Sequence, residues 1–180
     1  MSTEYTPAQI DNHESKSADK LDILYHDQEL IVCVKPVGLD YEVQLPALIK
    51  EIIHKDCYPV HRLDLNVGGV MVYALTKQAA SALSKAIQEK TMIKDYVALV
   101  HGITPEAGDY EDYLFKDSRK NKVFVVKKQR KGVKRARLEF KRIKTEQNTS
   151  LIHIRLYTGR SHQIRVQFSS RGYPLVGDHK

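Results

Sequence analysis

The sequence predicts an α+β fold, with a mixed, mainly antiparallel β-sheet and flanking helices. Short apolar segments bounded by turn residues recur along the 180 residues, which is typical of strands. Residues 151–156 alternate between two faces, as a half-buried strand does. Three other segments show the helical spacing of apolar residues, and the sequence has no internal repeat or heptad pattern. A strand-rich α+β architecture follows.

The first part of the chain is expected to form two strands and a short helix. The strands are predicted at Ile23–Tyr25 and Leu30–Val34, joined by a tight turn. Pro46 is expected at the first position of the helix, where its missing N–H costs no hydrogen bond. The apolar residues that follow, through Ile53, fall on a single stripe.

The middle of the chain combines a buried strand with an amphipathic helix. VMVYAL at residues 70–75 predicts the strand, and Thr76 is expected to cap the helix that follows. The apolar positions of this helix are Ala79, Ala80, Leu83 and Ile87. A further strand is expected within MIKDYVALVHG at residues 92–102.

The last part of the chain is expected to hold a hairpin, the alternating strand and a helix. The short β-like runs VFVV and ARLEF stand on either side of Gly132, which predicts a hairpin arm. Ser161 is expected to cap a helix that carries Ile164 and Phe168 on one face, with Gly172 as its C′ residue.

Charge is distributed unevenly along the chain. Residues 1–29 hold two lysines and seven acidic residues, a net charge of −5, whereas residues 116–144 hold fourteen Lys and Arg and two acidic residues, a net charge of +12. We therefore expect a mobile acidic tail at 1–20 and one domain at 21–180 with a basic arm at about 116–144. Basic residues interleaved with aromatic ones suit the phosphates and bases of a nucleic acid. The alternative is a solvated, charged loop.

Composition and motifs exclude several classes of protein. No apolar run approaches the ~20 residues of a membrane-spanning helix, and the N-terminal residues lack the pattern of a secretory or organelle signal. With two cysteines there is no disulfide framework, so we expect a soluble, cytoplasmic protein. P-loop, GxGxxG and HExxH motifs are missing, and Cys57 and His61 have no second pair nearby. We expect no cofactor, no metal, no membrane contact and no obligatory protein partner.

Two segments concentrate charge in otherwise apolar surroundings. They are HRLD at residues 61–64, before a predicted buried strand, and GRSHQIR at 159–165, at a predicted helix start. Charged groups in such places must pair or face a cleft, so the alternatives are a structural ion-pair network and an active site. An aspartate flanked by arginine stays ionised, which suits a nucleophile or a base. A single carboxylate with cationic partners is unlike the acid/base pair of a glycosidase.

These segments resemble the ordered motifs of a known family, the RluA-type pseudouridine synthases. The matching segments are HRLD at 61–64 with Gly69 following, KDYVALVHG at 94–102, TGRSHQIRVQF at 158–168 and GYPLVGD at 172–178. KPVG at 35–38 is similar to the early KPxG element of that family. The resemblance runs from about Ile23 to Asp178, and HRLD followed by GRxHQIR is highly specific.

The resemblance implies a pseudouridine synthase-like fold and an enzyme that isomerises specific uridines in ribosomal or transfer RNA without a cofactor. It implies that Asp64 is the catalytic aspartate, that Tyr96 packs on the target base, and that Arg165 holds the Asp64 carboxylate. Whether Asp64 adds to C1′ of the ribose or removes the C2′ proton stays open. The residues expected to bind the RNA substrate are His61, Arg62, Arg160, His162, Gln163, Lys127, Lys128, Arg130 and Lys131.

The chain departs from the family pattern at two places. Val67-Gly68-Gly69 stands where the family commonly has Thr-Ser-Gly, so two hydroxyl groups are missing. We also expect the domain to be C-terminally short, because the family usually continues beyond the position of Lys180. The alternative function is therefore a non-catalytic RNA-binding protein derived from the same family. A third is a basic protein that coats RNA without flipping bases.

Overall fold

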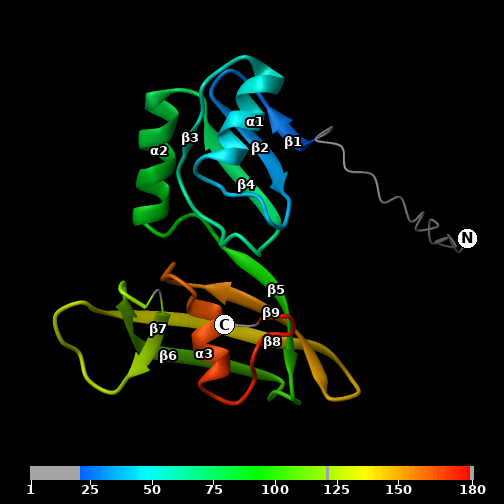
Figure 1. Ribbon diagram of the computed structural model, residues 1–180, viewed down its shortest axis with the longest axis vertical. Helices are drawn as coiled ribbons and strands as arrows, with labels where there is room; N and C mark the ends of the chain where they lie inside the picture. Colours follow the sequence, from blue (N-terminus) through cyan, green and yellow to red (C-terminus); the bar gives the residue numbers. More distant parts are fainter. Residues whose placement is uncertain (1–20, 121, 179–180) are drawn as a thin grey trace, which may run out of the picture. The chain divides into compact units, whose positions relative to one another are not determined.

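The computed structural model describes residues 21–120 and 122–178, and these residues divide into two compact units between Ala79 and Ala80 (Figure 1). Each unit has an antiparallel sheet of its own. The acidic tail expected at 1–20 lies outside the described residues. The α+β fold class, with mainly antiparallel sheets and flanking helices, is confirmed.

The first unit is built on a four-stranded sheet in the order β1-β2-β4-β3. Its strands are β1 (Asp22–His26), β2 (Leu30–Lys35), β3 (Tyr58–Pro59) and β4 (Gly69–Ala74). The strands expected in this part of the chain are confirmed. The inward-facing residues of β2 are Ile31, Cys33 and Lys35, and all three are fully buried. Lys35 thus occupies an inward-facing position of β2, where an apolar side chain is expected.

Helix α1 (Gln44–Ile53) begins two residues before Pro46, so the expectation that Pro46 opens the helix is wrong. The helix begins earlier because Asp40 organises the turn before it. The Oδ1 atom of Asp40 accepts hydrogen bonds from the backbone N–H groups of Glu42 and Val43, each at 2.8 Å. Pro46 still lies in the first turn, where N–H groups have no acceptor within the helix.

Helix α2 (Lys77–Gln88) runs across the division between the two units. The predicted cap at Thr76 is confirmed, since its Oγ1 atom accepts a hydrogen bond from the N–H of Ala79 at 3.1 Å. In the part of the chain that the structure describes, no helix has both the length and the apolar character needed to cross a membrane.

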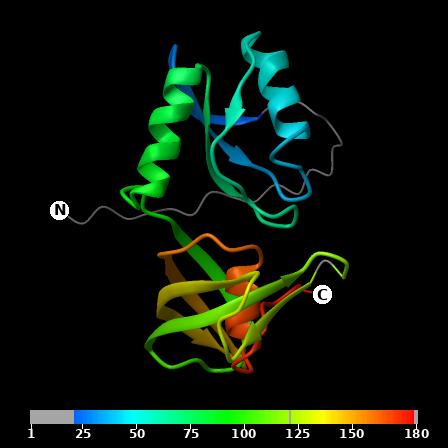
Figure 2. The same ribbon diagram turned by 90° about the vertical axis from the view of Figure 1, so that its left-hand side faces the viewer.

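The second unit is a five-stranded antiparallel sheet in the order β5-β9-β8-β6-β7, with α3 against one face (Figures 1 and 2). Its elements are β5 (Asp95–His101), β6 (Ala107–Asp117), β7 (Lys122–Val126), β8 (Val133–Glu146), β9 (Thr149–Leu156) and α3 (Gln163–Ser169). Phe168 of α3 packs on Phe140 of β8 with ring centroids 5.2 Å apart. Ile152 and Ile154 are fully buried in the same core, which confirms the predicted alternation of this strand.

The hairpin expected between VFVV and ARLEF does not form. β7 pairs with one edge of β6 through Phe115 and Phe124, whereas β8 pairs with the other edge of β6 through Phe115 and Val133. The two runs therefore lie on either side of β6, and the exposed loop 127–132 passes from one edge to the other (Figure 1). The prediction failed because the acidic sequence of β6 gave no sign of a strand.

The acidic residues of β6 are explained by their partners on β8. Arg137 pairs with Asp109 at 2.8 Å between Nη2 and Oδ2, and the Nε atom of Arg135 donates to Glu111 at 2.7 Å. Cross-strand pairs of opposite charge stabilise an antiparallel sheet. Two of the cations in the basic segment are thus paired with carboxylates on an exposed face of the sheet.

Helix α3 ends as predicted, with Gly172 at C′, but it does not begin with the predicted cap at Ser161. The residue before it is His162, in the left-handed region with φ 52°, and no side chain caps the helix, so the cap predicted at Ser161 is wrong. After the helix, the N–H of Gly172 donates to the carbonyl of Ser169 and the N–H of Tyr173 to that of Phe168, each at 3.0 Å. With φ 84° at Gly172, this is the pattern expected of a glycine at C′.

Candidate functional site

The HRLD loop of the first unit lies between β3 and β4 and is anchored at two residues. The Nε2 atom of His61 accepts a hydrogen bond from the N–H of Val72, a residue of β4, at 3.1 Å. Because Nε2 accepts, the proton of the neutral ring is at Nδ1. Leu63 is buried, with 7% of its surface exposed. The loop therefore presents Arg62 and Asp64 from a fixed backbone.

Asp64 is a partly exposed carboxylate beside a cation. Its Oδ1 atom is 3.1 Å from Nη2 of Arg62, and the side chains of Asp64 and Arg62 are 24% and 48% exposed, respectively. The guanidinium of Arg62 also lies 5.9 Å from the ring centre of Tyr41. Asp64 and its arginine neighbour thus remain accessible to a ligand.

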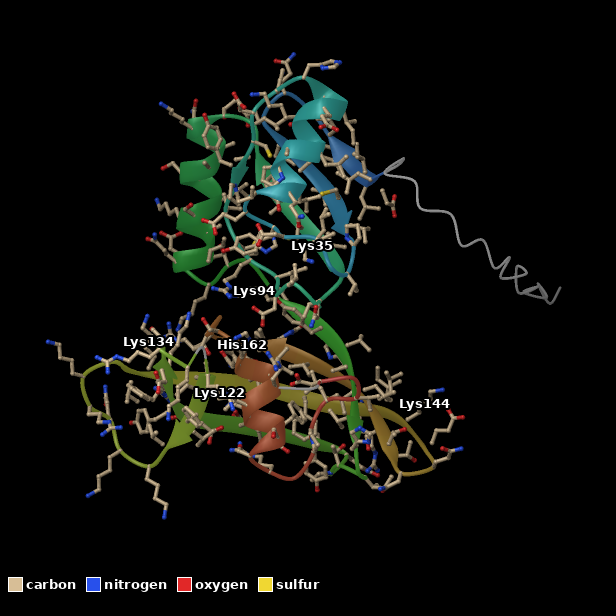
Figure 3. The ribbon with its side chains drawn as sticks, in the orientation of Figure 1. Lys35, Lys94, Lys122, Lys134, Lys144 and His162 are labelled. Atoms are coloured by element: carbon tan, nitrogen blue, oxygen red, sulfur yellow. The ribbon has the colours of Figure 1, made fainter. Side chains whose placement is uncertain are left out.

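Lys35, at the end of β2, holds the loop that carries Asp64 (Figure 3). Its Nζ atom donates hydrogen bonds to the carbonyl oxygens of Pro36 at 2.9 Å, Leu39 at 2.8 Å and Leu65 at 3.2 Å. Burial lowers the pKa of this ammonium, although the charges of Asp40 and Asp64 act in the opposite direction. Three carbonyl oxygens replace the water molecules that burial removes from the ammonium. The hydrogen bond to Leu65 joins the KPVG segment to the HRLD loop.

The glycine at position 68 allows these two segments to approach closely. A Cβ atom there would lie 3.3 Å from Cγ2 of Val37 and 3.4 Å from the carbonyl oxygen of Lys35. The N–H of Gly38 meanwhile donates to the carbonyl of Leu65 at 2.8 Å. Close packing therefore explains the glycine in the middle of Val67-Gly68-Gly69, because Gly68 lies against the backbone that Lys35 holds in place.

Tyr96 is in the second unit, on β5 opposite Ile154 of β9. It is half-buried and packs against the apolar core of that unit. Ala98 lies two positions further along the strand on the same face, and Lys94 lies two positions before Tyr96, immediately before β5. The surroundings of Tyr96 thus include a lysine.

Gln163 organises the GRSHQIR loop. It is 3% exposed, its Nε2 atom donates to the carbonyl of Arg137 at 3.1 Å, and its Oε1 atom accepts from Thr158 Oγ1 at 2.7 Å and from the N–H of Arg160 at 3.1 Å. The Nε atom of Arg160 donates to the carbonyl of Arg135 at 3.0 Å. The loop is thereby attached to β8 at several points, and Gln163 shapes it from inside.

Arg165 is oriented by two partners within its own unit. Its Nε atom donates to Oδ2 of Asp178 at 2.6 Å, and its Nη1 atom lies 3.1 Å from Nδ1 of His162. Since arginine only donates, Nδ1 of His162 is the acceptor. The expectation that Arg165 holds Asp64 stays a prediction, because the two residues belong to different units. No sequence motif singled out Asp178 as a partner of Arg165.

A cavity of about 670 Å³ lies between β7 and α3 of the second unit. Its apolar lining includes Val123 and Val125, and its charged lining residues are Lys120, Lys122, Arg165 and Asp178. Because Arg165 and Asp178 pair with each other, the two lysines leave the cavity with a positive balance. Residues 21–120 and 122–178 contain no group of three or more His, Cys, Asp or Glu side chains that could hold a metal ion.

The four cations predicted in the basic segment all lie in the exposed loop between β7 and β8. They are Lys127, Lys128, Arg130 and Lys131. The guanidinium of Arg130 lies 5.3 Å from the ring centre of Phe115. An exposed run of positive charge beside aromatic rings has the chemistry of a single-stranded nucleic-acid contact.

Comparison with known proteins gives one consistent result. The RNA pseudouridylate synthase family matches residues 29–170. The dual-specificity RNA pseudouridine synthase RluA of Escherichia coli (strain K12) is 34% identical over 94% of this chain and 80% of its own length. Ribosomal large subunit pseudouridine synthase D of Nitrosomonas europaea is 32% identical over 94% of the chain. The chain spans only about half of that relative, 53% of its length.

Solved structures show the same fold. Human RNA pseudouridylate synthase domain containing 4 is 27% identical, with a TM-score of 0.75 over 88% of this chain and 68% of that protein. Human RNA pseudouridylate synthase domain containing 1 has a TM-score of 0.82 over 92% of this chain and 71% of that protein. Its identity is 24%, so its likeness concerns the fold alone.

Proposed function

The chain belongs to the family of RNA pseudouridylate synthases, and we propose that it isomerises specific uridines to pseudouridine in ribosomal or transfer RNA. The observation that carries the proposal is the family match over residues 29–170, which includes both the HRLD and the GRSHQIR loops. Ribosomal large subunit pseudouridine synthase D supports ribosomal RNA. The tRNA pseudouridine synthase C of Haemophilus ducreyi, 31% identical over 89% of this chain and 74% of its own length, supports transfer RNA. Two free cysteines, Cys33 and Cys57, are compatible with a reducing cytoplasm as its compartment.

The proposed reaction moves the uracil ring from one bond to another. The N1–C1′ bond breaks, the ring turns while it stays bound, a C5–C1′ bond forms, and the proton lost from C5 is balanced by one gained at N1. Reactant and product have the same composition and oxidation state, so the reaction consumes no cofactor. The enzyme has to hold the free uracil ring and control the exchange of the C5 proton for one at N1.

We assign the central step to Asp64. Its carboxylate either adds to C1′ and later leaves, or removes the C2′ proton and later returns it. Both routes need an ionised, fixed and accessible carboxylate. The contact with Arg62 and the anchored HRLD loop support this assignment.

Tyr96 and Arg165 complete the proposed catalytic group. Tyr96 stacks on the freed uracil and helps to remove the C5 proton. Arg165 holds the carboxylate of Asp64 during the reaction. Asp178 and His162 take three of the five N–H donors of Arg165, so two donors remain for this role.

The remaining predicted residues bind the RNA in this proposal. Uridine must leave its stack to reach Asp64, which costs a few kcal/mol that backbone contacts have to offset. The loop cations Lys127, Lys128, Arg130 and Lys131 supply such contacts. The residues next to the proposed catalytic group that contact the RNA are His61, Arg62, Arg160 and His162, and Gln163 acts by shaping its loop.

Release of tritium from C5-labelled uridine tests the proposal directly. The wild-type protein is incubated with unmodified ribosomal and transfer RNA transcripts, beside the Asp64→Ala variant. The proposal requires release by the wild type only, with RNA binding retained in the variant. RNA binding without release by a folded wild-type protein would favour the non-catalytic RNA-binding alternative.

A further inference from the structure

Lys94 is a lysine in an unfavourable electrostatic environment. It is half-buried immediately before β5, and a Cβ atom on Gly159 would lie 3.5 Å from its Nζ atom. Burial, and then the positive charge of Arg160, lower the pKa of Lys94. The ammonium therefore lies against the GRSHQIR loop, beside a second cation.

A small cavity beside this pair is lined by further cations. Its volume is about 150 Å³, and its lining includes Lys116, Lys134, Gly159 and Arg160. Lys116 and Lys134 are exposed residues of β6 and β8. No carboxylate is among the lining residues of this cavity. Lys94 is not among the lining residues but lies against Gly159, which is. We call Lys94, Lys116, Lys134 and Arg160 the Lys94 cluster.

The Lys94 cluster differs from those cations of its unit that have a carboxylate partner. Several arginines of the unit pair with carboxylates, as in Arg137 with Asp109, Arg155 with Asp95 and Arg171 with Asp112. Among residues 21–120 and 122–178, no carboxylate forms an ion pair with any member of the Lys94 cluster. Four cations gathered without an acid lack a counter-charge, and an anion would supply one.

We propose that the Lys94 cluster binds a phosphate group of the RNA backbone next to the target uridine. The inference rests on the proposed function, because Tyr96 identifies where the uridine lies. Lys94 immediately precedes β5, its carbonyl accepts from the N–H of Leu156 at 2.9 Å, and Tyr96 is two residues further on, a rise of about 6.6 Å at ~3.3 Å per residue. A phosphate at Lys94 thus lies within one nucleotide of a base stacked on Tyr96. The cluster positions the substrate and takes no part in bond breaking.

A phosphodiester fits this site better than an uncharged base. The groups available are ammonium and guanidinium donors, which form charge-assisted hydrogen bonds with phosphate oxygens. Phosphate contacts of this kind fix the register of a nucleic acid without reading its sequence. Lys94 and Arg160 are therefore expected to affect affinity for all RNA sequences alike.

The salt dependence of RNA binding tests the proposal. The dissociation constant of a fluorescent RNA stem-loop with loop uridines is measured from about 50 to 200 mM salt for wild type, Lys94→Gln and Arg160→Gln. Each variant is expected to lower the slope of log K against log salt by about one and to weaken binding about tenfold at low salt. The matched control is Lys144→Gln, since Lys144 is exposed, pairs with Glu146 at 3.5 Å and lies at the other end of the sheet (Figure 3).

Thermal unfolding separates a binding role from a structural one. Lys94→Gln removes a charge that Arg160 repels, so its midpoint is expected to equal or exceed that of wild type. Addition of inorganic phosphate at constant ionic strength should raise the midpoint of wild type more than that of Lys94→Gln. A slope unchanged from wild type, or a change no larger than that of Lys144→Gln, overturns the proposal. Stabilisation by inorganic phosphate with an unchanged RNA slope overturns it too, because the site would then serve a small anion.

The outcomes also separate this proposal from the proposed function. Lowered slopes in the two variants, with no tritium release by wild type, would support the phosphate site and contradict the enzyme assignment. Tritium release by wild type with unchanged slopes would support the enzyme assignment and contradict the phosphate site.

Discussion

The Nζ atom of Lys35 lies 3.2 Å from the carbonyl oxygen of Leu65, the residue that follows Asp64. One buried ammonium thereby joins the end of β2 to the loop of the proposed catalytic aspartate. Its other two acceptors, the carbonyls of Pro36 and Leu39, belong to the KPVG segment and the residue after it. The two sequence motifs of the first unit are thus one structural element.

Replacement of Lys35 by methionine should destabilise the first unit. Methionine fills the space but leaves three buried carbonyl oxygens without their donor, which costs about 2–4 kcal/mol. Chemical denaturation measures this decrease in the free energy of unfolding. Lys50→Met is the control, because Lys50 is exposed and its ion-pair partner Asp56 is exposed as well. Equal effects of the two substitutions would contradict the role given to Lys35.

Replacement of Asp178 by asparagine should slow the reaction more than it weakens RNA binding. Asp178 orients Arg165 through an ion pair in which the arginine and aspartate side chains are 20% and 21% exposed. Without that carboxylate the guanidinium loses its direction, so we expect kcat to fall about tenfold or more and KM to change about twofold at most.

Asp112→Asn is the matched control for Asp178→Asn. It breaks another ion pair of the second unit, between Asp112 and Arg171 at 2.8 Å. We expect this variant to lose stability and keep kcat. A kcat in Asp178→Asn equal to that of the control would mean that Arg165 needs no such orientation.

Neutralising the loop between β7 and β8 should weaken RNA binding without a loss of stability. The four changes are Lys127→Gln, Lys128→Gln, Arg130→Gln and Lys131→Gln. All four residues are exposed, and the salt slope should fall by about one for each phosphate that the loop no longer neutralises. Binding measured over a range of salt concentrations gives the number of these phosphates. A slope equal to that of wild type would remove the loop from the RNA interface.

Prediction from sequence succeeded where apolar patterning determines the structure. The strands at β2, β4 and β9 follow from short apolar runs, and the cap at Thr76 follows from its position before an amphipathic stripe. β6 was missed because acidic residues are rare in strands and because Asp112, on the same face as Tyr110, breaks its apolar alternation. The partners of Asp109 and Glu111 on β8 are distant in sequence, and pairing between distant residues leaves no local pattern.

The proposed site was predictable to the extent that its residues form contiguous motifs. Lys35 is on the apolar face of β2, and a lysine there could have been recognised as a buried positioning group. The pairing of Arg165 with Asp178 and the burial of Gln163 depend on how loops fold back onto β8 and α3. Such contacts arise from tertiary structure and follow from no spacing in the sequence.

Stability should depend on pH through the acidic residues of β6. Hydrogen bonds from Arg137 lower the pKa of Asp109 below its ordinary value of 3.8, and those from Arg135 lower the pKa of Glu111 below 4.5. A carboxyl group with a depressed pKa contributes stability above its unfolded pKa, and that contribution is lost as pH falls through the folded value. Because these residues are exposed, the effect is small.

The measurement for this pH dependence is the free energy of unfolding between about pH 5 and pH 2. Wild type should lose more stability over this range than Asp109→Asn, which lacks one of the two carboxyl groups. If the two curves run parallel, the pairing of β6 with β8 gains nothing from this charge.

The central claim is that Asp64 performs the isomerisation, and Asp64→Asn tests it most directly. Asparagine keeps the shape of the side chain but neither adds to C1′ nor removes the C2′ proton. Tritium release from C5-labelled RNA is measured for wild type, Asp64→Asn and the control Asp56→Asn, which changes an exposed aspartate of the same unit. We predict release by wild type and by the control, none by Asp64→Asn, and RNA affinity within about threefold of wild type in all three. Release by Asp64→Asn at the wild-type rate would contradict the account.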